Sequence, residues 1–347
     1  MNKTDIKSLT YEKLKIEVAE IGEKPFRAKQ IFTWLHDRRV YSFDEMTDLS
    51  KALRSKLEEK YYISKLNIVN KLVSNEDNTI KYLFDIGDGV LIESVFMSYS
   101  YGNAVCVSSQ AGCRMGCSFC ASTVDGLERN LLSGEIAGQI YAIAEDTGEK
   151  ISNIVIMGSG EPLDNYDNVL GFLSIINSDM GLGIGMRHIT LSTCGLVDKI
   201  YDLMKLKLQI TLAISLHAPN DEIRQRIMPV AKKYPIDDVI KAAKLYADTT
   251  KRRVTYEYSL IRGVNDSTEN AKELASRLRG SMCHVNLIPI NDVKENNYTR
   301  SSEDNIKAFA AVLSNNSIEV TIRRKLGSDI NAACGQLRKS YKDNRGV

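Results

Sequence analysis

The stretch Cys113-Arg114-Met115-Gly116-Cys117-Ser118-Phe119-Cys120 places three cysteines in a C-x3-C-x2-C spacing, after an apolar run and before a helix signal. Thiolates this close together on one loop can converge on a single centre, and zinc and iron–sulfur clusters both take such donors. A closed zinc site needs a fourth ligand, and no second C-x2-C or H-x3-H follows nearby. Iron–sulfur clusters usually take four cysteines as well. Three cysteines would leave one iron open to a small molecule, and a half zinc site is the alternative.

Strand and helix patterns alternate around and after this loop. Strands are expected at 104–109, 153–157, 188–192, 209–215, 253–260 and 283–289, with one more at 318–323. Helices are expected at 133–145, 165–176, 236–246 and 267–278, with a further one around Phe309. This βα repeat predicts an α/β fold with a parallel sheet, either open or closed into a barrel.

Polar and metal-ligating side chains fall at or just after the ends of these expected strands. They are Cys113, the segment 158–161, Ser192, the segment 215–217 and Asn291. Folds of this class bind ligands at the carboxyl ends of parallel strands. The glycines of 158–161 would let the backbone approach a ligand, and Glu161 could accept from an ammonium or hydroxyl group. Each residue alone would suit an ordinary turn, but their common position predicts a ligand site.

Residues 1–95 are predicted to form a separate unit. Helical spacing runs over 11–21, 25–35 and 49–62, and strands are expected at 79–84 and 90–97 around a glycine-containing turn. The polar segment 98–103 ends in Gly-Asn and is interpreted as a linker. The boundary is therefore expected near residue 95, with a second domain over 96–347.

Composition favours a cytoplasmic enzyme. The chain has 347 residues, of which 43% are hydrophobic and 26% charged, which is enough for a large core. No apolar run approaches the roughly 18 residues of a membrane span, and the start lacks the features of a signal peptide. Seven cysteines are an odd count for a disulfide scaffold, so a reducing compartment is expected. We expect no membrane association and a monomer.

The net charge of +2 is bland, but basic residues are unevenly distributed. Residues 321–347 hold seven basic residues against two acidic ones. In the N-terminal unit, basic residues surround aromatic ones, a mixture that suits a phosphate backbone and unstacked bases. The residues are Lys24, Arg27, Lys29, Arg38 and Arg39, with Phe26, Phe32 and Trp34. An ordinary solvated helix face is the alternative interpretation.

Five further segments join the cysteine loop in resembling a known family. They are 108–113 (SSQAGC), 160–165 (GEPLDN), 214–220 (ISLHAPN), 285–289 (VNLIP) and 332–337 (AACGQL). The loop resembles that of radical S-adenosylmethionine (SAM) enzymes, and the whole set resembles the RlmN family of bacterial RNA methyltransferases. The resemblance implies a partial (β/α)6 radical SAM barrel with a small, mainly helical N-terminal accessory domain that binds RNA.

The resemblance also implies cofactors and their ligands. Cys113, Cys117 and Cys120 would bind a 4Fe-4S cluster whose open iron chelates SAM, and two SAM molecules would serve each turnover. A single histidine at a strand end is more often structural, so the SAM assignments depend on the family. The implied SAM contacts are Gly160, Glu161, Ser192, Ser215, Leu216, His217 and Asn291.

The same resemblance implies roles for three further residues. The family methylates carbon 2 of adenine, which carries no nucleophilic lone pair. A thiolate, Cys334, would first take a methyl group from SAM, and a 5′-deoxyadenosyl radical would then activate that methyl group. Cys106 would attack the Cys334 sulfur to release the product, leaving a transient disulfide bond. Glu93 matches the carboxylate proposed as the base, although a structural strand carboxylate and an inert strand cysteine are the alternatives.

The partners implied are 23S rRNA, tRNA and a flavodoxin- or ferredoxin-like electron donor. Two other functions stay open at this point. A Cfr-type enzyme would methylate carbon 8 of the same rRNA adenosine, although Pro162 in Gly-Glu-Pro-Leu favours the RlmN pattern over Gly-Glu-Ala-Leu. A non-catalytic iron–sulfur RNA-binding protein would not need Cys106 and Cys334 together with a SAM pocket.

Overall fold

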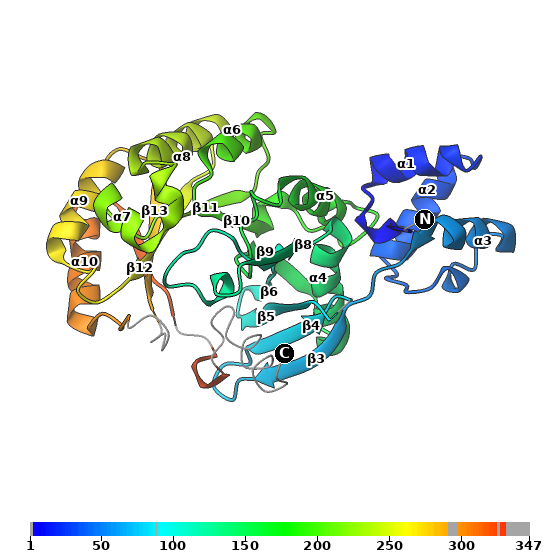
Figure 1. Ribbon diagram of the computed structural model, residues 1–347, viewed down its shortest axis with the longest axis horizontal. Helices are drawn as coiled ribbons and strands as arrows, with labels where there is room; N and C mark the ends of the chain where they lie inside the picture. The colour runs from blue at the N-terminus through cyan, green and yellow to red at the C-terminus, as the bar shows by residue number, and fades with distance from the viewer. Residues whose placement is uncertain (1–2, 88, 291–297, 325–326, 331–347) are drawn as a thin grey trace.

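The computed structural model describes residues 3–87, 89–290, 298–324 and 327–330. A ten-stranded sheet runs through the molecule in the order β14-β13-β12-β11-β10-β9-β6-β5-β4-β3 (Figure 1). Neighbouring strands from β6 to β14 are parallel, which confirms the predicted α/β fold with a parallel core. These strands are β6 (Gly102–Cys106), β9 (Ile151–Ile156), β10 (Ile189–Thr193), β11 (Thr211–Ser215), β12 (Val254–Leu260), β13 (Cys283–Pro289) and β14 (Glu319–Ile322).

Three antiparallel strands extend this sheet beyond β6. They are β3 (Asn67–Val73), β4 (Ile80–Asp85) and β5 (Leu91–Tyr99). β3 was not expected from the sequence, because its polar residues interrupt a simple alternation. β4 and β5 are hydrogen-bonded into the same sheet as the parallel strands, and residue 95 lies within β5. The division of the chain into two domains at that residue stays a prediction.

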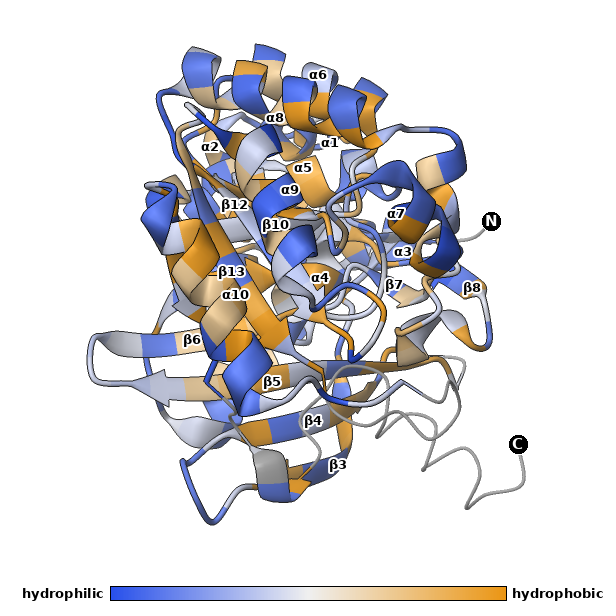
Figure 2. Cartoon of the chain, turned by 90° about the vertical axis from the view of Figure 1, so that its left-hand side faces the viewer, coloured by the Kyte–Doolittle hydropathy of each residue, from blue (hydrophilic) through white to orange (hydrophobic). Residues whose placement is uncertain are grey.

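Helices cover the outer face of the parallel strands in Figure 1. Figure 2 shows that they carry both hydrophobic and hydrophilic residues, as helices at a core surface do. α6 and α7 were not named among the expected helices, since both segments are short. The helices are α4 (Ser133–Thr147), α5 (Tyr166–Asn177), α6 (Val197–Lys205), α7 (Asp221–Ile227), α8 (Ile236–Thr250), α9 (Thr268–Leu278) and α10 (Glu303–Asn315).

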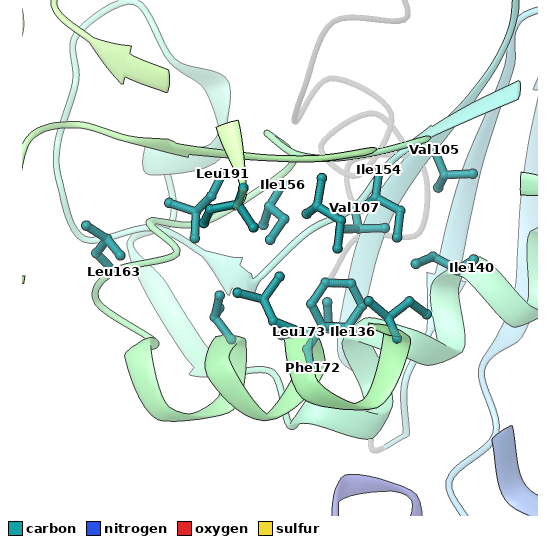
Figure 3. Close-up of a cluster of buried hydrophobic side chains, with 14 of the residues drawn as sticks. Val105, Val107, Ile136, Ile140, Ile154, Ile156, Leu163, Phe172, Leu173 and Leu191 are labelled. Atoms are coloured by element: carbon teal, nitrogen blue, oxygen red, sulfur yellow. The ribbon is translucent and has the colours of Figure 1, made fainter. Parts of the chain in front are cut away.

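The main core lies between the sheet and these helices (Figure 3). Branched side chains from β6, β9 and β10 meet Ile136 and Ile140 of α4 and Phe172 and Leu173 of α5. Phe172 has no exposed surface, so its replacement by alanine would cost about 3–5 kcal/mol of stability. This core fixes the strands whose ends carry the site.

The N-terminal region is mainly helical and joins the same core. It contains β1 (Thr4–Asp5), α1 (Tyr11–Glu20), α2 (Phe26–His36), α3 (Lys51–Lys60) and β2 (Tyr61–Tyr62). Thr10 is the N-cap of α1 and Ser50 is the N-cap of α3, and their hydroxyl groups accept from backbone N–H groups of the first turn. Gly134 of α4 lies so close that an added Cβ would be 2.8 Å from the Lys7 backbone. The helical region is thus packed directly against α4.

None of the helices in the described ranges is both long and apolar enough to cross a membrane.

Candidate active site

The cysteine loop lies between two short strands, β7 (Gln110–Gly112) and β8 (Leu127–Asn130). Gly112 has φ +77° and an added Cβ would lie 2.0 Å from the Gly126 carbonyl oxygen, so only glycine closes the loop here. The Thr123 hydroxyl donates to the carbonyl oxygens of Cys117 (3.2 Å) and Cys120 (2.9 Å). Hydrogen bonds within the loop therefore fix its conformation, and the pairing of β7 with β8 fixes its two ends.

The three cysteines lie close enough to influence one another. Cys113 and Cys117 are buried, and Cys120 is partly exposed. Burial, followed by the charges of Cys120, Glu161 and Asp164, raises the pKa of the Cys113 thiol to about 12. Burial and the other two cysteines also raise the pKa of Cys117. Thiolates that repel one another in a buried place require a positively charged centre to ionise together.

This donor set fits an iron–sulfur cluster better than a single ion. Within the described residues, no three His, Cys, Asp or Glu side chains are grouped closely enough to hold one metal ion. A zinc ion draws its ligands around one atom. The ligands of a four-iron cluster bind different irons and stand farther apart, and three loop thiols of this kind suit that arrangement. Cys113, Cys117 and Cys120 are the residues that would hold it.

Glu161 follows β9 and is buried. One carboxylate oxygen accepts from the Leu163 N–H (3.0 Å) and the other from the Cys194 N–H (2.7 Å). Burial raises its pKa, and these hydrogen bonds oppose the rise. Its charge in turn raises the pKa values of Cys113 and Cys117. The structure thus brings Glu161 beside the cysteine loop.

Close backbone contacts require glycine at two positions before Glu161, Gly158 and Gly160. An added Cβ on Gly160 would lie 2.8 Å from the Gln110 backbone nitrogen, and one on Gly158 would lie 2.7 Å from the Ser108 backbone nitrogen. These glycines let the end of β9 approach the segment that follows β6. Contact of Gly160 with a ligand stays a prediction.

Three other predicted SAM contacts lie on, or just after, two neighbouring strands. The hydroxyl groups of Ser192 on β10 and Ser215 on β11 are 3.4 Å apart. His217 is buried, and its Nδ1 accepts from the Ser259 N–H (2.9 Å), so the proton of the neutral ring lies on Nε2. Burial, aided by Arg224, lowers the pKa of His217 to about 3. The ring is therefore a neutral donor at physiological pH.

His217 also reaches the cysteine loop. Its ring meets the Phe119 ring edge-on, with 4.9 Å between centroids. Leu216 and His217 donate their backbone N–H groups to the Glu257 carbonyl oxygen, which bends the chain at the end of β11. Two of the predicted SAM residues, Glu161 and His217, therefore lie beside the cysteine loop at the carboxyl edge of the parallel strands.

Arg224 holds this edge together and was missed by sequence reasoning. Its guanidinium is fully buried and donates to the carbonyl oxygens of Cys194 (2.7 Å), Leu216 (3.2 Å) and Tyr234 (3.1 Å). These carbonyl groups belong to the segments after β10 and β11 and before α8. An arginine in a short helix looks like a surface residue, so only its burial reveals the role.

Glu93 and Cys106 lie on two neighbouring strands, β5 and β6, where the antiparallel part of the sheet meets the parallel part. Val95 lies two residues from Glu93 on β5 and pairs with Cys106 on β6, so all three side chains lie on one face. Ser94 points the other way, toward α4, where it donates to Gln139 (2.6 Å). Glu93 is buried and forms an ion pair with Lys81 of β4. The structure thus brings the two predicted catalytic residues to the inner face, away from α4.

Two predicted residues, Asn291 and Cys334, lie outside the described residues. A disulfide bond between Cys106 and Cys334 finds no support, because no disulfide joins the cysteines that the structure describes. The transient disulfide stays a prediction.

The N-terminal basic and aromatic residues are only partly a surface. Phe26 is 53% exposed, with the Arg27 guanidinium 4.8 Å from its ring centroid. The Arg38 guanidinium lies 3.9 Å from the Trp34 ring centroid. Phe32, however, is fully buried and contacts His36, so its inclusion in an RNA-binding surface was wrong. It faces the core because it lies one helical turn from the buried Leu35.

Comparison with known proteins shows the family of the chain. Residues 4–63 match the model of the ribosomal RNA large subunit methyltransferase N-terminal domain, and residues 107–275 match that of the radical SAM superfamily. The "probable dual-specificity RNA methyltransferase RlmN" of Clostridium novyi is 55% identical over 340 residues, covering 98% of this chain and 99% of the relative. The protein of the same description from Lachnoclostridium phytofermentans is 56% identical over 341 residues, covering 98% and 96%.

A solved structure agrees with the fold over nearly the whole chain. The crystal structure of a radical SAM methyltransferase from Sphaerobacter thermophilus has a TM-score of 0.90 and 43% sequence identity. The match covers 96% of this chain and 98% of that one. The sheet, its helices and the N-terminal helical region therefore have an experimentally determined counterpart.

Proposed function

Because the chain belongs to the RlmN family of dual-specificity RNA methyltransferases in the radical SAM superfamily, we propose that it methylates carbon 2 of one adenosine in 23S rRNA and of one adenosine in tRNA anticodon loops. Membership in an enzyme family removes the alternative of a non-catalytic iron–sulfur RNA-binding protein. The observation that carries the proposal is the common face shared by Glu93 and Cys106, on strands that lead into the cysteine loop.

The cofactor site is assigned to the edge described above. Cys113, Cys117 and Cys120 hold a 4Fe-4S cluster, and Glu161 accepts from the ammonium group of SAM. When bound, the cluster would supply the electron that cleaves SAM to a 5′-deoxyadenosyl radical, and Cys334 would carry the methyl group that gives up a hydrogen atom. His217 offers a neutral N–H donor beside Ser192 and Ser215, which suits the carboxylate and hydroxyl groups of SAM.

The inner face of β5 and β6 is assigned to the RNA base. Glu93 accepts the proton that leaves carbon 2 of the adenine. Cys106 then attacks the Cys334 sulfur, so that a sulfur–sulfur bond forms and the sulfur–carbon bond to the product breaks; the carbon keeps the electron pair and takes up a proton to become the methyl group. Burial of Cys106 beside Val95 keeps water from this step. Asn291 completes the SAM contacts in this proposal.

RNA recognition is assigned to the N-terminal helices, where Arg27 and Arg38 lie over exposed or partly exposed aromatic rings. The electron for SAM cleavage comes from a flavodoxin- or ferredoxin-like donor in the cytoplasm. Methylation at carbon 8 is the competing outcome for the same adenosine, and Pro162 favours carbon 2 through its match to the RlmN pattern.

The test is mass spectrometry of nucleosides from a strain that lacks its own enzyme and expresses this chain. Digested 23S rRNA and tRNA are compared with synthetic 2-methyladenosine and 8-methyladenosine. We expect 2-methyladenosine in both RNAs, and none with Cys334→Ala. A product that co-elutes with 8-methyladenosine, or 2-methyladenosine in neither RNA, would contradict the proposal.

A further inference from the structure

We propose that Lys81 is a positioning residue for the base of this reaction: it keeps the Glu93 carboxylate ionised and fixed at the inner face of the sheet. This inference rests on the proposed function, in which Glu93 accepts the ring proton. Lys81 belongs to none of the motifs recognised in the sequence, and it acts through Glu93 without needing to touch the RNA.

The two side chains form a pair across adjacent strands. Lys81 Nζ lies 3.2 Å from Glu93 Oε2, and the exposed fractions of the two side chains are 0% and 4%. Leu83 pairs with Glu93 in the register of β4 and β5, so Lys81 is its diagonal neighbour on the same face. The register of two central strands therefore holds the ammonium group against the carboxylate.

Apolar side chains lie beside this pair on the inner face. On the same face lie Val95, Met97 and Cys106 toward β6, and Leu83 with Leu91 on the β4–β5 side. A carboxylate buried in such surroundings without a cation takes up a proton, because burial disfavours its charged form. A protonated Glu93 could not accept another proton, so the base needs its neighbouring cation.

Proton transfer is the step in which this matters. When the carbon–hydrogen bond at carbon 2 breaks, its electron pair stays with the purine and the proton moves to a Glu93 oxygen, while the one excess electron of the radical adduct would pass to the oxidised iron–sulfur cluster. The neutral acid that results leaves Lys81 as a buried charge beside an uncharged partner. That state favours passing the proton on, which returns Glu93 to its ionised form.

Other titratable groups near Glu93 are few in the described part of the chain. Cys106 faces it from β6 and Tyr99 lies farther along β5 on the same face. The pKa of Tyr99 is raised by burial, with smaller effects from Tyr101, Arg323, Cys106 and Asp77. Ser108 holds the backbone of Glu93 by donating its hydroxyl to the Glu93 carbonyl oxygen at 2.6 Å. Among the described residues, Lys81 is a cation in direct contact with the carboxylate.

The experiment measures single-turnover RNA methylation against pH with the cluster-loaded enzyme. In Lys81→Met the acid limb of the profile should move at least about one unit toward higher pH, and the rate at pH 7 should fall at least about tenfold. Covalent protein–RNA adduct should accumulate, since the radical addition comes before proton removal. Lys81→Arg keeps the charge and should restore the acid limb.

A matched control comes from the neighbouring strand. Lys71 of β3 lies on the other face and pairs with Asp146 of α4 at 2.9 Å, with 43% of its side chain exposed. Lys71→Met removes the same group from the same sheet and should leave the pH profile unchanged. An unshifted acid limb in folded Lys81→Met would overturn the inference, and so would an equal shift in Lys71→Met.

Two further variants keep the test decisive. If Lys81→Met does not fold, the double variant Lys81→Met/Glu93→Gln removes the carboxylate charge as well. A folded double variant supports the ionised pair. An unfolded double variant shows that Lys81 has a packing role and overturns the inference. Glu93→Gln separates the inference from its premise. Full turnover by Glu93→Gln would refute Glu93 as the base, whereas loss of product in Glu93→Gln with a normal profile in Lys81→Met would refute Lys81 alone.

Discussion

The parallel and antiparallel parts of the sheet present their functional groups differently. In the parallel part, Glu161 and His217 follow the ends of β9 and β11, where backbone N–H groups and Arg224 hold them. In the antiparallel part, Glu93 lies within β5 and is held by a side chain of β4. Strand ends are open to a cofactor, whereas positions within strands are rigid and dry. One sheet thus presents both the edge proposed to bind the cofactors and the buried face that holds the proposed base.

Loss of a cluster ligand should have the largest effect on the parallel part. Cys113→Ala, Cys117→Ala or Cys120→Ala should abolish binding of a 4Fe-4S cluster after anaerobic reconstitution, because each removes one of three thiolate donors. Iron and sulfide analysis with absorption spectroscopy measures the loss. Cys283→Ala changes a cysteine of β13 outside the loop and should keep the cluster. Stoichiometric zinc without iron in the wild type would contradict the assignment.

The role of the inner face can be tested through Cys106, with Cys334 as the second thiol proposed to take part in the reaction. Cys106→Ala should still be methylated and attack RNA but then stall as a covalent protein–RNA species, because nothing displaces the Cys334 sulfur. Denaturing gels should show the trapped RNA. Cys334→Ala and the double variant should load a cluster and trap none. Full turnover by Cys106→Ala would show that Cys106 on the inner face is not needed for product release.

Arg224 tests how the parallel edge is held. Arg224→Met would leave three buried carbonyl groups without their donor, so the free energy of unfolding should fall by about 2–5 kcal/mol. Denaturant unfolding measures the change. Arg226→Met, an exposed arginine two residues along the same short helix, should change stability by less than about 0.5 kcal/mol. Equal effects of the two would show that the buried hydrogen bonds do not stabilise this edge.

His217 should make the stability of the parallel edge depend on pH. Its folded pKa of about 3 lies below the ordinary value of 6.5, so the unfolded chain binds more protons between these values. Stability contributed by the neutral ring is complete above pH 6.5 and is lost as the pH falls, at up to about 1.4 kcal/mol per pH unit. His217→Asn, which tolerates the positive φ of 57°, should remove this part of the slope. Denaturant unfolding at several pH values measures this slope. An unchanged slope in His217→Asn would exclude the imidazole ring as its source.

The smallest effect is expected in the N-terminal helices, outside both parts of the sheet. Arg38→Ala should weaken RNA binding by about three- to tenfold at low salt, through loss of one phosphate or base contact. Filter binding or fluorescence anisotropy measures this. Lys199→Ala removes another cation over an aromatic ring, with Nζ 4.7 Å from the Tyr166 ring centroid, and should leave RNA affinity unchanged. Deleting the region would be less informative, because it shares the main core.

Residues at strand ends could be anticipated from the order of the chain, and residues within strands could not. Periodicity located β9, β10 and β11, so Glu161, Ser192 and Ser215 were expected to meet. Arg224 and Lys81 were missed because charged residues are ordinarily exposed, and nothing local marks a buried one. Phe32 was wrongly assigned to the surface, because the position of a residue around the helix axis decides whether its side chain is buried or exposed.

The sequence by itself determined the cysteine loop, the alternation of strands and helices, and the family to which both belong. These follow from spacing and period, which are local properties of the chain. Only the tertiary structure decided that Lys81 pairs with Glu93 and that Cys106 shares their face, because strand register and the choice of face arise from packing across the whole sheet. A shift of one residue in either strand would turn these side chains toward α4, and nothing in the local sequence forbids that shift.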